Sequence, residues 1–403
     1  MAHRVAVTGV GVISAFGRGA EAFWQGLSTG TSGIRPLQAM DPAELRFGQG
    51  AEVPDLDPSG EIAREVLHIS DRFAWMALLA ARDAVADAGL SAADVAGTGT
   101  AVATGSCLGG QGVQDVEYER LFGERRSRLH PLTIPRVMAN SGASLISMDL
   151  GIEGPGFTLS TACSSANHAL GQALWLLRSG AAERAIAGGS EAPFTRANLL
   201  AWSALRVVSP DTCRPFSADR DGMILGEGAG MLMLETLEAA RARGARIYAE
   251  LAGCGMSCDA HHVTQPSERG PAAALSAALA DAGLAPEQIG YVNAHGTGTD
   301  ANDPTECAAL RRVFGAHAER LAVSSTKSMH GHALGAAGAL EGVATALALY
   351  HGLLPPTANF TRPDPACDLD VVPNDPRTAE VEAALSSSFA FGGLNAVLAL
   401  RRV

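Results

Sequence analysis

The hydrophobic pattern of the chain alternates short apolar runs with longer segments in which Ala and Leu recur at helical spacing. The runs RVAVTGV (4–10) and GTAVATGS (99–106) are typical of buried strands. The segment DRFAWMALLAARDAVADAGL (71–90) predicts a helix that stops near Gly89. Buried strands that alternate with helices indicate an α/β fold in which helices cover both faces of the sheet.

The same pattern occurs twice along the chain. ADAGLSAADV (86–95) and ADAGLAPEQI (280–289) each end a helical segment before a strand, and RVAVTGVGV at position 4 corresponds to RIYAELAGCG at position 246. Later in each half a short strand precedes an apolar helix, within 157–180 and within 321–352. The shared order favours an internal duplication. We expect halves 1–244 and 245–403, with the boundary near Gly244, packed as one body because no low-complexity linker separates them.

Composition narrows the class of protein. The 403 residues are 47% hydrophobic and 18% charged, which is typical of a compact globular chain. The net charge of −12 argues against nucleic-acid binding and favours small molecules, or proteins met through a local basic patch. No run of 18 apolar residues predicts a membrane span, and the Gly-rich start does not resemble a signal peptide. Seven Cys without a CxxC pair predict free thiols in a reducing cytoplasm.

Cys163 stands at the start of a helical segment, 164–179, that is apolar nearly all round and is therefore expected to be buried. At a helix N-terminus the unpaired N–H groups and the dipole stabilise a thiolate, and the small neighbours in STACSSA leave room for a substrate. A lone Cys is more often structural, so the argument for a nucleophile depends on the rest of the chain.

Two further segments carry candidate chemistry. NAHGTGTDANDPTE (293–306) places His295 directly after a predicted strand, and SSTKSMHGHALGAAG (324–338) places Lys327 and His332 between a strand and a helix. His330 and His332 have no carboxylate or Cys in a recognised ligand spacing, so we expect no metal site. GVGVIS (9–14) lacks the full glycine pattern of a dinucleotide-binding loop, so we expect no dinucleotide cofactor.

Together these segments resemble the 3-oxoacyl-acyl-carrier-protein synthases, which are elongating condensing enzymes of the thiolase superfamily. TACSSA resembles the family's nucleophile motif, NAHGTGT its first His motif, STKSMHGHALGAAG its Lys/His motif, and SFAFGGLNA (388–396) its C-terminal loop. The four motifs follow the family's order and span essentially the whole chain. The resemblance implies a duplicated αβαβα five-layer sandwich, usually a homodimer.

The resemblance also implies the roles of individual residues. Cys163 is expected to attack an acyl-carrier-protein thioester and to hold the acyl chain, with the N–H groups of Cys163 and Phe391 as the oxyanion hole. Neutral His295 and His332 are expected to donate hydrogen bonds to the malonyl thioester carbonyl while CO2 leaves. Lys327 is expected to be held by Glu341 and to act electrostatically. The acidic positions expected to organise this network are Asp303 and Glu306.

Substrate and partners stay open at this stage. Ala390 and Leu394 depart from the loop of housekeeping fatty-acid enzymes and resemble nodulation-factor and type II polyene ketosynthases, so the chain could be saturated or polyunsaturated. Leu108 and Trp202 are expected to line the acyl tunnel, with core packing as the alternative. No cofactor is expected beyond the phosphopantetheine of the carrier protein. Arginines expected to dock that acidic carrier are Arg64, Arg128 and Arg206.

Three rival functions are weaker. A thiolase carries a second catalytic Cys in the C-terminal loop, where this chain has Phe391. A non-catalytic chain-length-factor subunit usually lacks the nucleophile, whereas Cys163 is present; such a subunit is instead a possible partner in a heterodimer. A Cys hydrolase leaves Lys327, the second His and the duplication unexplained.

Overall fold

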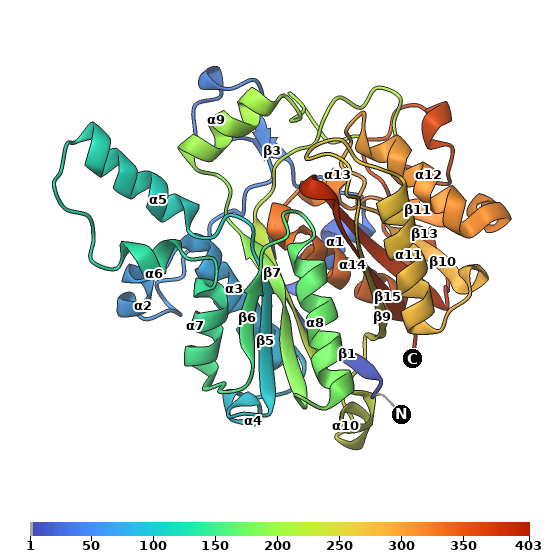
Figure 1. Cartoon of the computed structure of the whole chain (residues 1–403), viewed down its shortest axis with the longest axis horizontal. Coiled ribbons are helices and arrows are strands. Elements are labelled where there is room, and N and C mark those ends of the chain that lie inside the picture. The colour runs from blue at the N-terminus through green and yellow to red at the C-terminus, as the bar shows by residue number, and fades with distance from the viewer. Residues whose placement is uncertain (1–2) are drawn as a thin grey trace.

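The computed structural model describes residues 3–403 and is built around one long mixed sheet (Figure 1). Its strands in the first half are β1 (Val5–Ser14), β5 (Thr100–Gly105), β6 (Gly156–Leu159), β7 (Arg184–Glu191) and β8 (Gly228–Thr236). Those in the second half are β9 (Ala249–Cys258), β10 (Ile289–Asn293), β11 (Ala322–Ser324), β14 (Ala383–Ala390) and β15 (Leu394–Arg401). The short strand β2 (Gly17–Arg18) pairs with β1.

The strand order shows the duplication directly. The sheet runs β6-β5-β7-β8-β1 through the first half and β9-β15-β14-β10-β11 through the second. In each half the second strand by sequence, β5 or β10, pairs in parallel with two neighbours, and the remaining pairs are antiparallel. β1 and β9 join the halves, with Val5 opposite Leu251. The predicted thiolase-like duplicated fold is therefore confirmed, while Gly244 lies in the turn before β9.

Helices form three layers around this sheet (Figure 1). The major helices are α3 (Arg72–Asp87), α7 (Ser141–Leu150), α8 (Ser165–Ser179), α11 (Arg269–Ala282), α12 (Asn302–Phe314) and α14 (Ala337–His351). α3 and α7 cover the outer face of the first half, and α11 packs on β9 and β15 with α12 beside it. α8 and α14 touch each other and strands of both halves, so they form the central layer.

Shorter elements lie on the periphery. The helices are α1 (Ala20–Ser28), α2 (Arg64–His68), α4 (Ala92–Val95), α5 (Gln111–Tyr118), α6 (Thr133–Val137), α9 (Arg196–Leu205), α10 (Leu237–Ala242) and α13 (Lys327–His330). The short strands pair as β3 (Arg35–Pro36) with β4 (Gln49–Gly50) and β12 (Leu353–Leu354) with β13 (Arg377–Thr378). Single turns of interest are η5 (Leu334–Ala336), η6 (Pro365–Cys367) and η7 (Phe391–Gly393).

Local sequence explains the helix boundaries. Asp71 caps α3 by accepting a hydrogen bond from the Phe73 N–H, and Gly89 adopts the left-handed conformation just after the helix ends, as predicted. The expectation that α8 is buried all round is wrong at Trp175, which is 40% exposed, because α8 reaches the surface at its C-terminal end. α14 is the helix buried at every position from 337 to 349. No helix within residues 3–403 is long and apolar enough to cross a membrane.

Candidate active site

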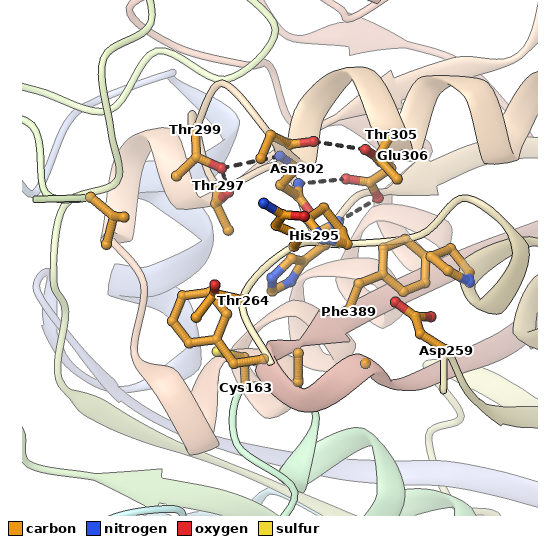
Figure 2. A pocket seen from close by; sticks show the side chains of 18 of the residues that line it. Cys163, Asp259, Thr264, His295, Thr297, Thr299, Asn302, Thr305, Glu306 and Phe389 are labelled. Atoms are coloured by element: carbon orange, nitrogen blue, oxygen red, sulfur yellow. Dashed lines mark hydrogen bonds between the residues drawn. The ribbon is translucent and has the colours of Figure 1, made fainter. Parts of the chain in front are cut away.

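A cavity opens where loops from the two halves meet, and the predicted nucleophile and both predicted His line it. Cys163 precedes α8, His295 follows β10, and His332 precedes α14. One ligand atom from each of these three side chains lies within 4.8 Å of the other two. Figure 2 shows Cys163 on one side of the His295 ring and Glu306 with Asn302 on the other. Three segments from the two halves of the chain thus meet at one point, as expected where the carboxyl ends of parallel strands converge.

A tight turn presents Cys163 to the cavity. Ala162 has a positive φ of 51°, and Ser165 Oγ donates to its carbonyl oxygen at 2.6 Å while accepting from the Thr161 N–H at 2.9 Å. Cys163 is left only 8% exposed. Burial raises its pKa to about 11, although Lys327 and nearby N–H groups act in the opposite direction. Desolvation of the sulfur thus outweighs the stabilisation that the helix N-terminus provides, and the thiol form is favoured.

The C-terminal loop closes over the sulfur. The backbone N–H groups of Phe391 and of Cys163 itself lie near the sulfur and oppose the rise in its pKa. The ring of Phe391 stacks on Trp202 of α9, with centroids 6.3 Å apart and planes 23° apart. The two N–H groups named as an oxyanion hole come from the C-terminal loop and from the turn before α8, and both lie near the sulfur, which fits the predicted role.

Carboxylates on α12 hold the turn that carries His295. Glu306 accepts hydrogen bonds from the backbone N–H groups of His295 at 2.8 Å and Gly296 at 2.7 Å. Asp303 accepts from the Gly298 N–H at 3.2 Å and from the Phe216 N–H at 2.8 Å. Burial raises the pKa of Glu306 to about 7. Both acidic residues therefore position backbone, which is the organising role predicted for them.

Lys327 and Glu341 form a fully buried ion pair beneath the cavity. Lys327 Nζ also donates to the carbonyl oxygen of His295 at 2.7 Å and to its Nδ1 at 3.3 Å. Burial raises the pKa of Glu341 to about 7 even though the Lys327 cation lowers it. The pairing predicted for these two residues is present, and it places a positive charge near the imidazoles of His295 and His332.

The position of the ring proton on His295 and on His332 follows from the donor that each Nδ1 atom faces. Nδ1 of His295 faces the donor Nζ of Lys327, and Nδ1 of His332 accepts from the Leu334 N–H at 3.2 Å. The neutral rings therefore carry their proton on Nε2. Burial and the Lys327 charge lower the pKa of both rings well below the ordinary 6.5. Two neutral N–H donors beside Cys163 are what stabilisation of an enolate oxygen requires.

The same three side chains offer sulfur and nitrogen donors to a metal ion. The residues fit such an ion poorly, because Lys327 holds His295 and adds a positive charge beside the cluster. His330 is not part of the group: its Nε2 lies 3.0 Å from Thr326 Oγ1 and its ring packs near Phe23. The absence of a metal stays a prediction.

The two predicted tunnel residues lie in different places. Trp202 lines the cavity beside Cys163, whereas Leu108 packs in the adjoining hydrophobic cluster that also contains Trp202. Sequence reasoning missed Glu191, a buried carboxylate that accepts from Ser106 Oγ at 2.9 Å and from the Cys107 N–H at 2.7 Å. Glu191, the last residue of β7, therefore holds the loop that follows β5 and carries Leu108. No sequence motif indicates this role, which depends on the pairing of β5 with β7.

The three predicted docking arginines are exposed and form no ion pair among residues 3–403. Arg64 begins α2, Arg128 lies in the loop before α6, and Arg206 ends α9 in a left-handed conformation. Arg206 is the one beside the cavity, since its neighbour Val207 lines it. A second feature missed from sequence is the loop at Val263, whose carbonyl oxygen accepts from the Gly392 N–H at 2.7 Å and borders the cavity mouth.

Comparisons with known proteins agree with this geometry. Residues 2–240 match the family "Beta-ketoacyl synthase, N-terminal domain" and residues 248–361 match "Beta-ketoacyl synthase, C-terminal domain". The chain is 47% identical over 100% of both sequences to Nodulation protein E of Rhizobium sp. (strain N33). It is 42% identical, over 99% of this chain and 98% of the relative, to 3-oxoacyl-[acyl-carrier-protein] synthase 2 of Synechocystis sp.. The solved structure of the ishigamide ketosynthase/chain length factor matches all of both chains with a TM-score of 0.96 and 40% identity.

Proposed function

The chain belongs to the β-ketoacyl synthase family, and on that premise we propose how the residues around Cys163 carry out the decarboxylative condensation of this family. The enzyme is a condensing enzyme of the acyltransferase class. It joins a Cys-bound acyl chain to malonyl-acyl-carrier protein and gives 3-oxoacyl-acyl-carrier protein and CO2. One observation supports the residue assignment: the Cys163 sulfur and one ring nitrogen each of His295 and His332 all lie within 4.8 Å of one another.

The first step loads the acyl chain. Cys163 Sγ attacks the thioester carbonyl of the acyl carrier, and the developing oxyanion accepts hydrogen bonds from the N–H groups of Phe391 and Cys163. The carrier sulfur leaves and takes the proton that the Cys163 thiol gives up. Because the resting group is a thiol, that proton has to move during the attack, and the adjacent Lys327 charge stabilises the sulfur as it does so.

The second step forms the carbon nucleophile. Nε2–H of His295 and of His332 donate to the thioester carbonyl oxygen of malonyl carrier protein. The C–C bond to the carboxylate breaks, CO2 leaves, and the electron pair forms an enolate that both donors stabilise. The enolate carbon then attacks the acyl-Cys163 carbonyl, and the Cys163 sulfur leaves as a thiolate that takes a proton from solvent to restore the thiol. Lys327 acts by orienting His295 and keeping both rings neutral.

The substrate travels on the phosphopantetheine of a carrier protein, so we propose no cofactor held by this chain. An exposed apolar surface on α5, α6, α7 and the loop between α5 and α6, including Phe122, Ile134 and Met148, supports a second subunit as partner. The match to a ketosynthase/chain length factor supports a heterodimer as much as a homodimer. Seven free thiols support a cytoplasmic location.

The test measures which products form from acyl-carrier and malonyl-carrier proteins. We expect carrier-dependent CO2 release matched by a carrier-bound product two carbons longer, read by intact mass. Hydrolysis of the acyl carrier without CO2 release would overturn the proposal in favour of a Cys hydrolase. Primers of increasing length, saturated and polyunsaturated, would then assign the substrate. Charge reversal at Arg206 is expected to raise the KM for carrier protein a few-fold while kcat stays unchanged, since exposed charges contribute little each.

A further inference from the structure

Glu191 connects the two halves of the chain through hydrogen bonds to both of its carboxylate oxygens. Its side chain is fully buried. Oε1 accepts from Ser106 Oγ at 2.9 Å and from the Leu108 N–H at 3.2 Å. Oε2 accepts from the Cys107 N–H at 2.7 Å and from the Gly335 N–H at 3.1 Å. Three of the four donors thus belong to the loop after β5, whereas the fourth belongs to η5 in the second half.

The backbones of these elements approach one another closely around the carboxylate. A Cβ atom on Gly335 would overlap Glu191 Oε2 and would lie 2.6 Å from the Cys107 nitrogen. A Cβ atom on Gly189 of β7 would lie 3.1 Å from the Gly335 carbonyl oxygen. Glycine at these two positions therefore lets η5 approach β7 and the loop after β5. Because no side chain separates the backbones here, the Glu191 carboxylate is placed to hold η5 against the first half.

The same turn carries the contact that orients the His332 ring. The Leu334 N–H donates to Nδ1 of His332 at 3.2 Å, and the next N–H along the chain, that of Gly335, is the one that Glu191 accepts. Leu334 has a positive φ of 48°, a conformation that L residues keep only where their surroundings hold it. The His332 backbone is held separately, by hydrogen bonds of 2.7 Å and 2.9 Å to residues 224–226. Glu191 therefore acts on the peptide that fixes the ring and not on the His332 backbone.

We propose that Glu191 is a positioning residue for His332. Its carboxylate holds the Gly335 N–H, which keeps the left-handed Leu334 in place with its own N–H on Nδ1, so that the ring proton stays on Nε2. Without the carboxylate the Leu334–Gly335 peptide is free to rotate, and the ring can turn or take the other tautomer. Glu191 itself does not line the catalytic cavity, so it acts through His332. This role rests on the function proposed for His332 as a donor to the enolate oxygen.

The test is a double-mutant cycle on decarboxylation of malonyl-carrier protein, with Glu191→Ala and His332→Ala as the two changes. Glu191→Ala should lower kcat by about 10-fold and leave the KM near that of the unmodified chain, because a misplaced donor weakens the transition state more than substrate binding. In the His332→Ala chain the same change should cause no further loss, since the group that it positions is absent. A purely structural role for Glu191 predicts equal losses in both chains, and that result would overturn the proposal.

The matched control is Ser106→Ala, which removes a donor from Oε1 of Glu191 and leaves the Gly335 N–H on Oε2. Its kcat for decarboxylation should stay close to that of the unmodified chain. A loss as large as that of Glu191→Ala would show that a general loosening of the carboxylate network lowers the rate, and it would contradict a role that acts through Gly335. Melting temperatures of all variants confirm that folded chains are compared.

A second readout does not depend on activity. Ring-nitrogen chemical shifts of His332, measured by NMR on histidine-labelled chain and assigned by their loss in His332→Ala, report its tautomer and its hydrogen bond. We expect the Nε2–H form in the unmodified chain and changed shifts in Glu191→Ala; unchanged shifts would overturn the proposal. If Glu191→Ala does not fold, glycolic acid in place of Gly335 removes only the N–H that Glu191 accepts and replaces that variant in both tests. If His332→Ala decarboxylates normally, the proposed function of His332 fails, while the chemical shifts still decide whether Glu191 positions the ring.

Discussion

The two halves share one topology but differ in the connection between their third strand and their central helix. In the first half, residues 160–164 link β6 to α8, and one left-handed residue, Ala162, turns the chain so that Cys163 faces the cavity. In the second half the longer segment 325–336 links β11 to α14 and includes α13 and η5. The short connection presents a nucleophile, and the long one has room for Lys327 and His332.

The two halves also differ in the buried charges that they place around the cavity. The buried ion pair Lys327–Glu341 and the carboxylates of α12 belong to the second half. The first half contributes one buried carboxylate near the cavity, Glu191, which is satisfied by N–H and O–H donors and has no cationic partner. Duplication therefore supplies two equivalent connections at the ends of two strands. Their different lengths and the buried charges around them explain why one carries the proposed nucleophile, Cys163, and the other carries groups proposed to stabilise an anion.

The largest effect is expected from the first-half connection. Cys163→Ala should abolish the acyl-enzyme and elongation, because no other thiol lines the cavity between residues 3 and 403. Decarboxylation of malonyl-carrier protein should persist, since it uses the second-half donors. Intact mass measures the acyl-enzyme, with Cys107→Ala as the matched control. Normal acyl-enzyme in Cys163→Ala would remove Cys163 from its assigned role.

The next largest effect is expected from the second-half connection. His295→Ala and His332→Ala should each lower malonyl decarboxylation by about 100-fold or more and impair acylation of Cys163 less, because each change removes one enolate donor. His330→Gln, in the same segment but outside the cavity lining, is the control. A variant that decarboxylates normally yet fails to acylate would show that its His serves the first half instead.

A third prediction compares the segments that follow the second strand of each half. Leu108 lies after β5 in the first half, and His295 lies after β10 in the second half. Leu108→Phe should keep turnover of short primers and lower that of long ones by about 10-fold, because a close-packed wall yields only at a cost of roughly 1–3 kcal/mol. The ratio of kcat/KM for long and short primers measures this. Equal loss for both lengths, with a lower melting temperature, would place Leu108 in the core alone.

The last prediction concerns the stability of the fold in acid, to which the buried histidines of the second half contribute. These are His295, His330 and His332. Burial lowers the pKa of His330 from 6.5 to about 3. Below pH 6.5 the unfolded chain binds a proton that the folded chain does not, so this stability is present above pH 6.5 and is lost as pH falls toward 3. Between pH 6.5 and pH 5 the free energy of unfolding should fall by about 1.6 kcal/mol more for the unmodified chain than for His330→Gln. Urea unfolding at both pH values measures the difference, and parallel losses would contradict the shifted pKa.

The sequence by itself determined the elements and their duplication, because apolar periodicity and the repeated ADAGL segments are local signals. Its motifs also singled out Cys163, His295, Lys327 and His332, and the family resemblance assigned their roles. Each of these features lies within a few residues of a strand or helix end, so a short window of sequence is enough to find it.

Only the tertiary structure decided the electrostatics and the contents of the cavity. The pKa of Cys163 rises rather than falls, because desolvation depends on everything packed around the sulfur and not on its place in a helix. Trp202 rather than Leu108 lines the cavity, and Glu191 fixes a loop from 83 residues away at the Leu108 N–H. Burial and long-range contacts are properties of the packed chain, so no local pattern encodes them.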